Sequence, residues 1–285
     1  IGGAMTGLIP FAIPPWKPEI YHLGPIPIDP WMTLVCVGII IGLEISRARG
    51  IKLGLDTRDV VDGAAFTVIC GFVGGHLLHV LGYHPERLET EGIMALIKIW
   101  TGYSSMGGFV GAVIGFLIFF TYIRPLPRWI HADTLIFGFP IAQMFGRLGC
   151  VSVHDHVGAV TTFPLGVTFD PDVWPLYDID GAKIMEVSVR HDPALYEAIV
   201  CLVIGLVFFY LAKKARPAGF FIGAWCLMYA PVRFSLDFMR AAGLKADDVR
   251  YFGLTPAQYI TLSMMVFGLY LVVKMRSKKE AVSAQ

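Results

Sequence analysis

An arginine stands at the end of a long uncharged stretch, in the segment Gly146–Gly158. If this segment is helical, Arg147, Cys150 and His154 follow at i, i+3 and i+7 and share one face. A charged side chain in the apolar part of a membrane costs about 2.5–3.5 kcal/mol, so such residues are functional candidates by default. The alternative is an arginine that reaches the membrane surface beside a polar helix end. We expect the helix to end near His154–His156.

A second group of polar residues follows at helical spacing. Tyr229, Arg233, Asp237 and Arg240 recur at i, i+4, i+8 and i+11, which predicts one helix face. In the structural interpretation, Arg233 pairs with Asp237 along the helix and Arg240 caps its end. A single carboxylate needs only one arginine as its partner, whereas two arginines on one buried face can bind a phosphate in a bidentate manner. The functional interpretation is therefore an anion site.

A third group lies where a helix is expected to enter an apolar region. Asp192 and Pro193 have the residue types of a helix N-cap and first turn. Tyr196 and Glu197 then fall in the first turn of that helix. Glu197 is a candidate counter-ion for an arginine. Alternatively, it is an acid favoured by the dipole at the helix N-terminus.

Three weaker patterns fit either ligand binding or ordinary packing. Gly107 and Gly108 begin an apolar run, where their backbone could approach a ligand or another helix. His76 and His79 lie at i, i+3 without a clear third metal ligand. The triplet His154–His156 could bind a metal, but adjacent side chains point in different directions. We therefore expect no metal ion and no cofactor.

Composition places these motifs in a membrane. Of 285 residues, 55% are hydrophobic and only 16% are charged, and the net charge of +1 gives no indication of a nucleic-acid partner. Backbone polar groups cannot stay unpaired in lipid, so each long apolar run predicts a transmembrane helix. The predicted fold class is an all-α integral membrane protein with about seven transmembrane helices. They correspond to the runs Trp31–Leu43, Gly63–Leu81, Met106–Ile123, Thr134–Phe145, Leu195–Ala212, Gly219–Val232 and Gln258–Val273.

The chain divides into an arm, residues 1–30, and a transmembrane domain, residues 31–285, with a small head inserted at 152–193 between helices four and five. The arm is rich in proline and aromatic residues and is expected at the outer membrane interface. Two short strands are predicted in the head, at 163–169 and 187–189. Lys and Arg are more frequent on the side of the C-terminus, which predicts a periplasmic N-terminus and head and a cytoplasmic C-terminus. The five cysteines lie in or beside apolar runs and are expected to be buried thiols.

The order of these motifs resembles that of the prolipoprotein diacylglyceryl transferase family, from Gly24 to the last predicted helix. The most specific match is Gly146–Gly149, which is similar to the family's Gly-Arg-Leu/Ile-Gly-Asn signature, although Cys150 replaces the asparagine. Met106 stands at the position of the histidine proposed as the family's catalytic base, and Trp31 at that of a tyrosine. The other matching positions are Gly74–His76 (with His76 in place of an arginine), Lys98–Trp100, Gly107, Gly108, Asp155, Gly158, Arg190, His191, Leu195–Glu197, Tyr229, Arg233, Asp237 and Arg240.

The resemblance implies a bacterial inner-membrane enzyme that moves the diacylglyceryl group of phosphatidylglycerol to a lipoprotein cysteine. Membrane lipids and the preprolipoprotein signal peptide are the implied partners. Arg147 and Arg233 are expected to hold the phosphodiester and to line one cavity open to the outer leaflet. The residues expected to bind lipid or substrate around them are Tyr229, Asp237, Arg240, Glu197, Gly107, Gly108, Gly158 and Cys150.

Met106 replaces the family's catalytic histidine, and its side chain cannot take a proton. Another residue must therefore accept the proton of the acceptor thiol. We expect His154, Asp155 and His156 to supply this proton acceptor, with His154 preferred because it shares the face of Arg147. An ion-pair or N-cap role for the triplet is the alternative. Two other functions also stay open. One is a related enzyme with a different acceptor, and the other is a non-catalytic membrane subunit that binds lipid or lipoprotein.

Overall fold

The computed structural model describes residues 12–23, 26–98, 102–244 and 250–283. The chain forms two compact units, each described by itself below. The first comprises Ile1–Ile39, Ile141–Val203 and Val232–Asp248, and the second Ile40–Pro140, Ile204–Pro231 and Val249–Gln285. Several positions of the sequence analysis lie outside the described residues, namely 1–11 of the arm, Gly24, and Ile99 and Trp100 of the matched segment Lys98–Trp100.

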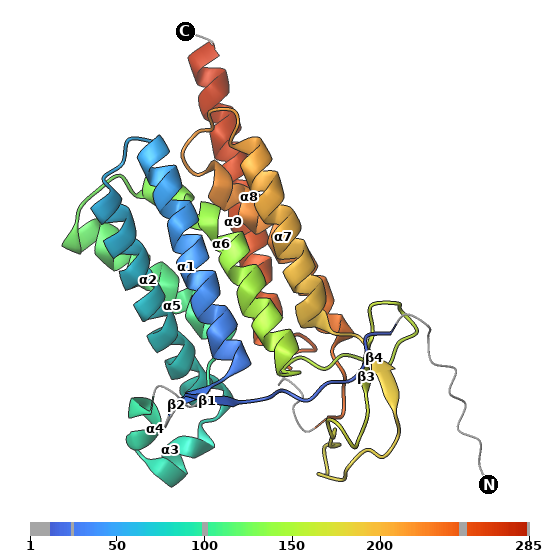
Figure 1. The fold of residues 1–285 in the computed structure, drawn as a ribbon. Coiled ribbons are helices and arrows are strands. Elements are labelled where there is room, and N and C mark those ends of the chain that lie inside the picture. Colours follow the sequence, from blue (N-terminus) through green and yellow to red (C-terminus); the bar gives the residue numbers. More distant parts are fainter. Residues whose placement is uncertain (1–11, 24–25, 99–101, 245–249, 284–285) are drawn as a thin grey trace. The chain divides into compact units, whose positions relative to one another are not determined.

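All seven predicted apolar runs fall in helices, except for the end residues Ala212 and Gly219, which lie in turns (Figure 1). Within the described residues, six helices are long and apolar enough to cross a membrane. The seventh, α8, has 17 residues, or about 25 Å, against a hydrocarbon core of about 30 Å. The protein is thus an all-α integral membrane protein, and the count of seven spans stays a prediction. The seven helices are α1 (Pro30–Lys52), α2 (Thr57–Leu78), α5 (Ser105–Ile118), α6 (Arg128–Ser152), α7 (Pro193–Leu211), α8 (Phe220–Leu236) and α9 (Pro256–Ser283).

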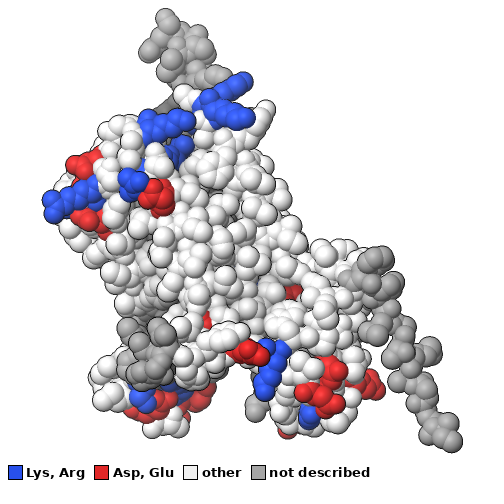
Figure 2. All heavy atoms as spheres, viewed as in Figure 1, with Lys and Arg blue, Asp and Glu red and all other residues white. Residues whose placement is uncertain are grey.

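The surfaces of these helices are those of a membrane protein. On the face drawn in Figure 2, Lys, Arg, Asp and Glu gather at the helix ends, and the surface along the helices is largely uncharged. Large apolar side chains are exposed on the long helices, for example Ile40, Val113 and Leu206, with exposed fractions of 66%, 58% and 58%. Lipid, unlike water, accommodates such side chains without cost.

Glycines join two helices of the second unit. Helix α5 runs along α2, and a Cβ built on Gly74 would lie 2.7 Å from the carbonyl oxygen of Gly107. A Cβ on Gly107 would in turn clash with the carbonyl oxygen of Gly74. Small residues at these positions let the two backbones approach closely, as is common between transmembrane helices. Ser104 caps α5, because its hydroxyl accepts from the backbone N–H of Gly107 at 3.3 Å.

Shorter elements complete the second unit. Helices α3 (Glu86–Glu91) and α4 (Met94–Ile97) follow α2, and α2 and α5 end in single π-helical turns at His79–Tyr83 and Phe119–Ile123. The start of α8 is fixed by the buried Asp133 on α6, whose carboxylate accepts from the backbone N–H groups of Gly219 at 2.9 Å and Ile222 at 3.0 Å.

The head belongs to the first unit and is built on a short antiparallel ladder. Strand β3 (Val167–Phe169) pairs with β4 (Ser188–Arg190), with Val167 opposite Arg190. Both strands lie within a residue of the predicted segments, although β3 is shorter. The arm adds a parallel bridge, in which the backbone of Ile13 bonds those of Gly166 and Thr168 at 2.9 Å each. A second hairpin, β1 (Tyr21–Leu23) and β2 (Ile26–Ile28), leads to α1 at Pro30, the predicted boundary of the arm.

Candidate active site

A buried carboxylate joins two arginines in the first unit. Arg147 lies near the end of α6, Glu197 in the first turns of α7 and Arg233 near the end of α8. Arg147 Nε donates to Glu197 Oε1 at 2.8 Å, and Arg233 Nε lies 3.5 Å from Glu197 Oε2. All three are almost fully buried, with exposed fractions of 3%, 2% and 4%. The two arginines therefore meet on one carboxylate, while the expected cavity open to the outer leaflet stays a prediction.

The expected pair between Arg233 and Asp237 is present, and Asp237 is completely buried. The single helix face predicted from Tyr229 to Arg240 is wrong at its end, because α8 stops at Leu236 and a 3-10 turn covers Asp237–Met239. Arg240 follows with extended backbone. Burial and the nearby Arg233 lower the pKa of its guanidinium, which places Arg240 in the same positively charged neighbourhood.

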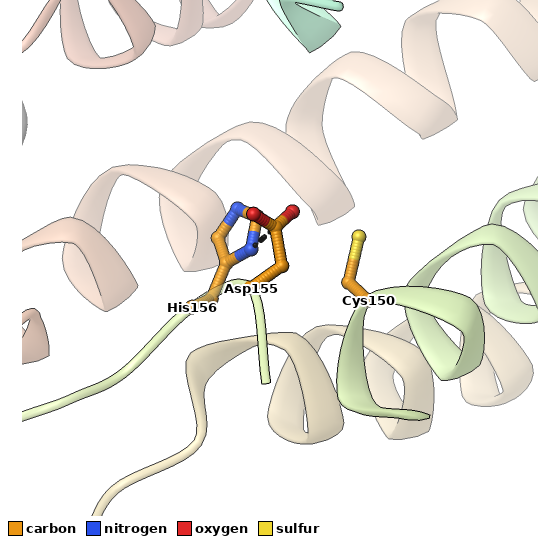
Figure 3. A group of neighbouring side chains, drawn as sticks. All are labelled: Cys150, Asp155 and His156. Carbon is orange, nitrogen blue, oxygen red and sulfur yellow. Dashed lines mark ion pairs between the residues drawn. The ribbon is translucent and has the colours of Figure 1, made fainter. Parts of the chain in front are cut away.

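Cys150 lies on the last turn of α6, and Asp155 and His156 lie in the loop that follows (Figure 3). The loop folds back over the helix end, since the backbone N–H of Asp155 donates to the carbonyl of Cys150 at 3.2 Å. Asp155 Oδ2 lies 3.1 Å from His156 Nδ1, and Arg147 Nη1 lies 3.3 Å from His156 Nε2. Because a guanidinium can only donate, Nε2 must accept from Arg147 and Nδ1 carries the ring proton.

The electrostatics of this loop are consistent with a neutral imidazole beside an ionised carboxylate. Burial lowers the pKa of His156, and Asp155 offsets only part of that effect. Partial desolvation by the surrounding groups alone would raise the pKa of Asp155, although 54% of its side chain is exposed. The adjacent His156 and the guanidinium groups of Arg147 and Arg240 outweigh it and hold that pKa well below its usual range. Asp155 therefore stays ionised at neutral pH, and it orients the ring of His156.

His154 lies apart from this pair, and the expectation that it continues the Arg147–Cys150 face is wrong. Helix α6 ends at Ser152, and His154 has a left-handed φ of 51°. Its ring packs against Trp16, Phe169 and Trp174, at centroid distances of 4.1, 5.1 and 5.3 Å. Its Nε2 lies 3.0 Å from the carbonyl oxygen of Trp16, so this histidine joins the arm to the head.

Gly158 and the residues before α7 hold the loop in place. The backbone N–H of Gly158 donates to the carbonyl of His191 at 2.8 Å, and Gly158 also bridges Arg240. A Cβ on Gly158 would lie 2.5 Å from that His191 oxygen, so only glycine fits without displacement. Asp192 caps α7 as expected, accepting from the backbone N–H of Leu195 at 3.0 Å, and burial raises its pKa to about 6.

The remaining predicted residues belong to the second unit. Tyr229 is 1% exposed and stacks on Trp225 at 4.3 Å between ring centroids. Gly107 has the helix-packing role described above, and a Cβ on Gly108 would meet only Gly71 O, at 3.8 Å. Met106 is also buried there. A ligand contact for Tyr229, Gly107 and Gly108 stays a prediction.

One residue of the site was not singled out from the sequence, and one contact of another residue was not foreseen. Gln143 Nε2 lies 3.4 Å from Glu197 Oε1, which adds a neutral donor to the network. It precedes Arg147 by one helical turn, so a polar residue at i−4 was the available signal. Trp31 lies against Gly149, whose Cβ would be 3.1 Å from the indole ring. Trp31 was matched above to a family tyrosine, but its contact with Gly149, which joins α1 to α6, left no signal in the local sequence.

Comparison with known proteins gives a consistent assignment. The family described as prolipoprotein diacylglyceryl transferase matches residues 18–274. Similar curated proteins are the phosphatidylglycerol–prolipoprotein diacylglyceryl transferases of Phenylobacterium zucineum, at 28% identity over 91% of this chain and 92% of the relative, and of Actinobacillus pleuropneumoniae serotype 3, at 27% over 94% and 97%. The relative from Solidesulfovibrio magneticus is 28% identical over 93% and 96%. The chain therefore belongs to the prolipoprotein diacylglyceryl transferase family.

Proposed function

We propose that this protein transfers the diacylglyceryl group of phosphatidylglycerol to the cysteine thiol of a prolipoprotein. The observation that carries the proposal is the network in which Arg147 and Arg233 share the buried carboxylate of Glu197. Family membership supplies the reaction class, and the network supplies donors for a phosphate. Arginine forks match phosphate oxygens in a bidentate manner and keep their charge when buried.

In the proposed reaction, the acceptor sulfur attacks the carbon of the diacylglyceryl group that is bonded to the phosphate oxygen. The carbon–oxygen bond breaks, and glycerol phosphate leaves with a second negative charge on its phosphate. Arg147 and Arg233, with Arg240 in the same neighbourhood, stabilise that growing charge. Glu197 and Asp237 hold the two guanidinium groups before the lipid binds, so that little reorganisation is needed when the charge develops.

The thiol proton goes to His156 in this proposal rather than to His154. Asp155 holds the Nδ1 proton of His156, and Nε2 keeps a lone pair beside Arg147. A histidine oriented by a carboxylate in this way is the usual form of a general base. His154, in contrast, donates to a backbone carbonyl among aromatic rings. When Arg147 Nη1 donates to the phosphate in place of His156, the Nε2 lone pair becomes available.

The setting of the reaction follows the charge pattern of the chain. Lys and Arg are more frequent in the linkers and tail on the membrane side of the C-terminus, which favours a cytoplasmic C-terminus and a periplasmic N-terminus, arm and head. The site would then open at the outer leaflet of the bacterial inner membrane. There the cysteine that follows a lipoprotein signal peptide would meet phosphatidylglycerol, with the signal peptide held among the helices.

A strain depleted of its own prolipoprotein diacylglyceryl transferase tests the proposal. Expression of this chain should restore growth and the mobility shift of a reporter lipoprotein, and the Arg147→Ala variant should restore neither. Absence of rescue, with the wild-type chain present in the membrane at normal amounts, would contradict the acceptor assignment.

The assignment of the base is tested separately with purified variants. His156→Gln should lower turnover by at least about 100-fold, the lower end of what a general base contributes. His154→Gln should weaken the packing of the head while the folded fraction keeps its rate. Wild-type turnover by His156→Gln would remove His156 from the mechanism.

A further inference from the structure

Three metal-ligating side chains of different chemistry converge beside the arginine network. The ligand atoms of Cys150, Asp155 and His156 all lie within 4.8 Å of one another. Figure 3 shows the thiol and the carboxylate side by side, with the imidazole on the other side of the carboxylate. The three come from two segments, the last turn of α6 and the loop that folds back over it. The cluster is therefore formed by the fold and not by adjacent side chains alone.

The donor set selects the kind of ion. Sulfur, nitrogen and a single carboxylate together are typical ligands of Zn²⁺, whereas Mg²⁺ and Ca²⁺ prefer oxygen alone. Bonds of about 2.0–2.3 Å in a tetrahedron separate ligand atoms by about 3.3–3.8 Å, so the widest separation in the cluster, at most 4.8 Å, must shorten by up to about 1.5 Å. The Asp155 side chain is 54% exposed and can make that movement, while Cys150 is held on a helix.

We propose that Cys150, Asp155 and His156 form a Zn²⁺ site whose occupation switches the proposed transfer reaction off. Binding of Zn²⁺ is inferred from the cluster alone, whereas inhibition of the transfer reaction rests on the proposed function. Three protein ligands leave a fourth position for water, as in open zinc sites.

Proton positions explain the switch. The nitrogen of His156 that faces Asp155 is Nδ1, and it binds the metal only after giving up its proton. In a neutral imidazole that proton then lies on Nε2, which can no longer accept one from the acceptor thiol. Cys150 loses its own proton to the solvent when it binds as thiolate, so one proton is released for each ion bound. The contact from Arg147 Nη1 to Nε2, now 3.3 Å, is replaced by a repulsion between two donors.

Cobalt provides a direct test on the full-length protein in detergent. Co²⁺ in such a site gives d–d bands of a four-coordinate ion and a thiolate-to-metal charge-transfer band, and Zn²⁺ should displace it. Cys150→Asn should lose the charge-transfer band and bind more than about tenfold more weakly. The expectation that all five thiols are buried is wrong for Cys36, which is exposed on α1, so Cys36→Ser should leave the spectrum unchanged. Asp155→Asn is the second ligand variant, to be used if Cys150→Asn does not fold, and it should keep the thiolate band with weaker binding.

Transfer assays on the same proteins test the switch. Zn²⁺ should inhibit the wild type and Cys36→Ser, and should inhibit Cys150→Asn more than about tenfold less, each relative to its own metal-free rate. A wild-type cobalt complex without a thiolate band, or one that Cys150→Asn leaves unchanged, would overturn the site. Metal binding without inhibition would overturn the switch. If the wild type has no transfer activity, the spectra still decide the site, so the two proposals fail separately.

Discussion

Glu197 is an ion-pair partner of two buried guanidinium groups, so Glu197→Gln is a sharp perturbation of the site. The substitution keeps the shape of the side chain and an oxygen for the 2.8 Å contact with Arg147, but it removes the negative charge. Breaking a buried ion pair by neutralising one partner costs about 3–5 kcal/mol. Arg233 keeps Asp237 as a partner, so most of the loss falls on Arg147 and the lower end, about 3 kcal/mol, is expected.

The assay is the free energy of unfolding in detergent micelles, measured with and without glycerol phosphate. Without the anion, the variant should lose about 3 kcal/mol of a stability that is typically about 5–15 kcal/mol. With it, the variant should regain more stability than the wild type gains, because the phosphate replaces the missing charge. Glu44→Gln, which breaks a largely exposed pair with Arg47, is the matched control and should change little. A Glu197→Gln variant as stable as the control would refute the account of how these charges are held.

Three further predictions concern the phosphate donors, the cap of α7 and the glycine interface. Arg233→Lys should stay folded but lose about 100-fold in turnover, because lysine has no planar fork, whereas Arg58→Lys on an exposed arginine should have no effect. Burial raises the pKa of Asp192 from 3.8 to about 6, so its stabilising contribution is complete below about pH 4 and is lost as the pH rises through 6. Asp192→Asn should therefore match the wild type in unfolding free energy at pH 4 and exceed it by up to about 3 kcal/mol at pH 7. If variant and wild type were equally stable at both pH values, ionisation of the buried Asp192 would not destabilise the fold. Gly107→Ala should lose about 1–3 kcal/mol of unfolding free energy through overpacking against α2. The control Gly146→Ala, with nothing within 4 Å of the added Cβ, should be tolerated. Similar losses for both variants would contradict the close packing.

Features that depend on local sequence could be predicted. The apolar runs gave the helices because an unpaired backbone is excluded from lipid whatever the neighbouring chain does. Asp192 and Pro193 located the start of α7, since capping is a matter of a few adjacent residues. Arg147 and Arg233 stood out because charges in apolar runs need partners, and Glu197, also within such a run, is the partner they share.

Features that depend on contacts between distant segments could not be predicted. His154 leaves the helix face because its ring packs on Trp16, which is 138 residues away along the chain. The end of α6 at Ser152 follows from that packing and from the return of Asp155 to the carbonyl of Cys150. Helical periodicity cannot anticipate a left-handed residue that is not glycine, such as His154, so the choice between His154 and His156 required the structure.

Phosphatidylglycerol labelled in two places gives the most direct test of the central claim. One label is placed in the diacylglyceryl part and another in the headgroup glycerol, and the lipid is incubated with the purified protein and a lipoprotein peptide that contains one cysteine. We expect the first label to appear in the peptide and the second in glycerol phosphate, in equal amounts. A peptide with serine in place of cysteine should yield neither product. Release of the headgroup label without any label in the cysteine peptide would contradict this expectation.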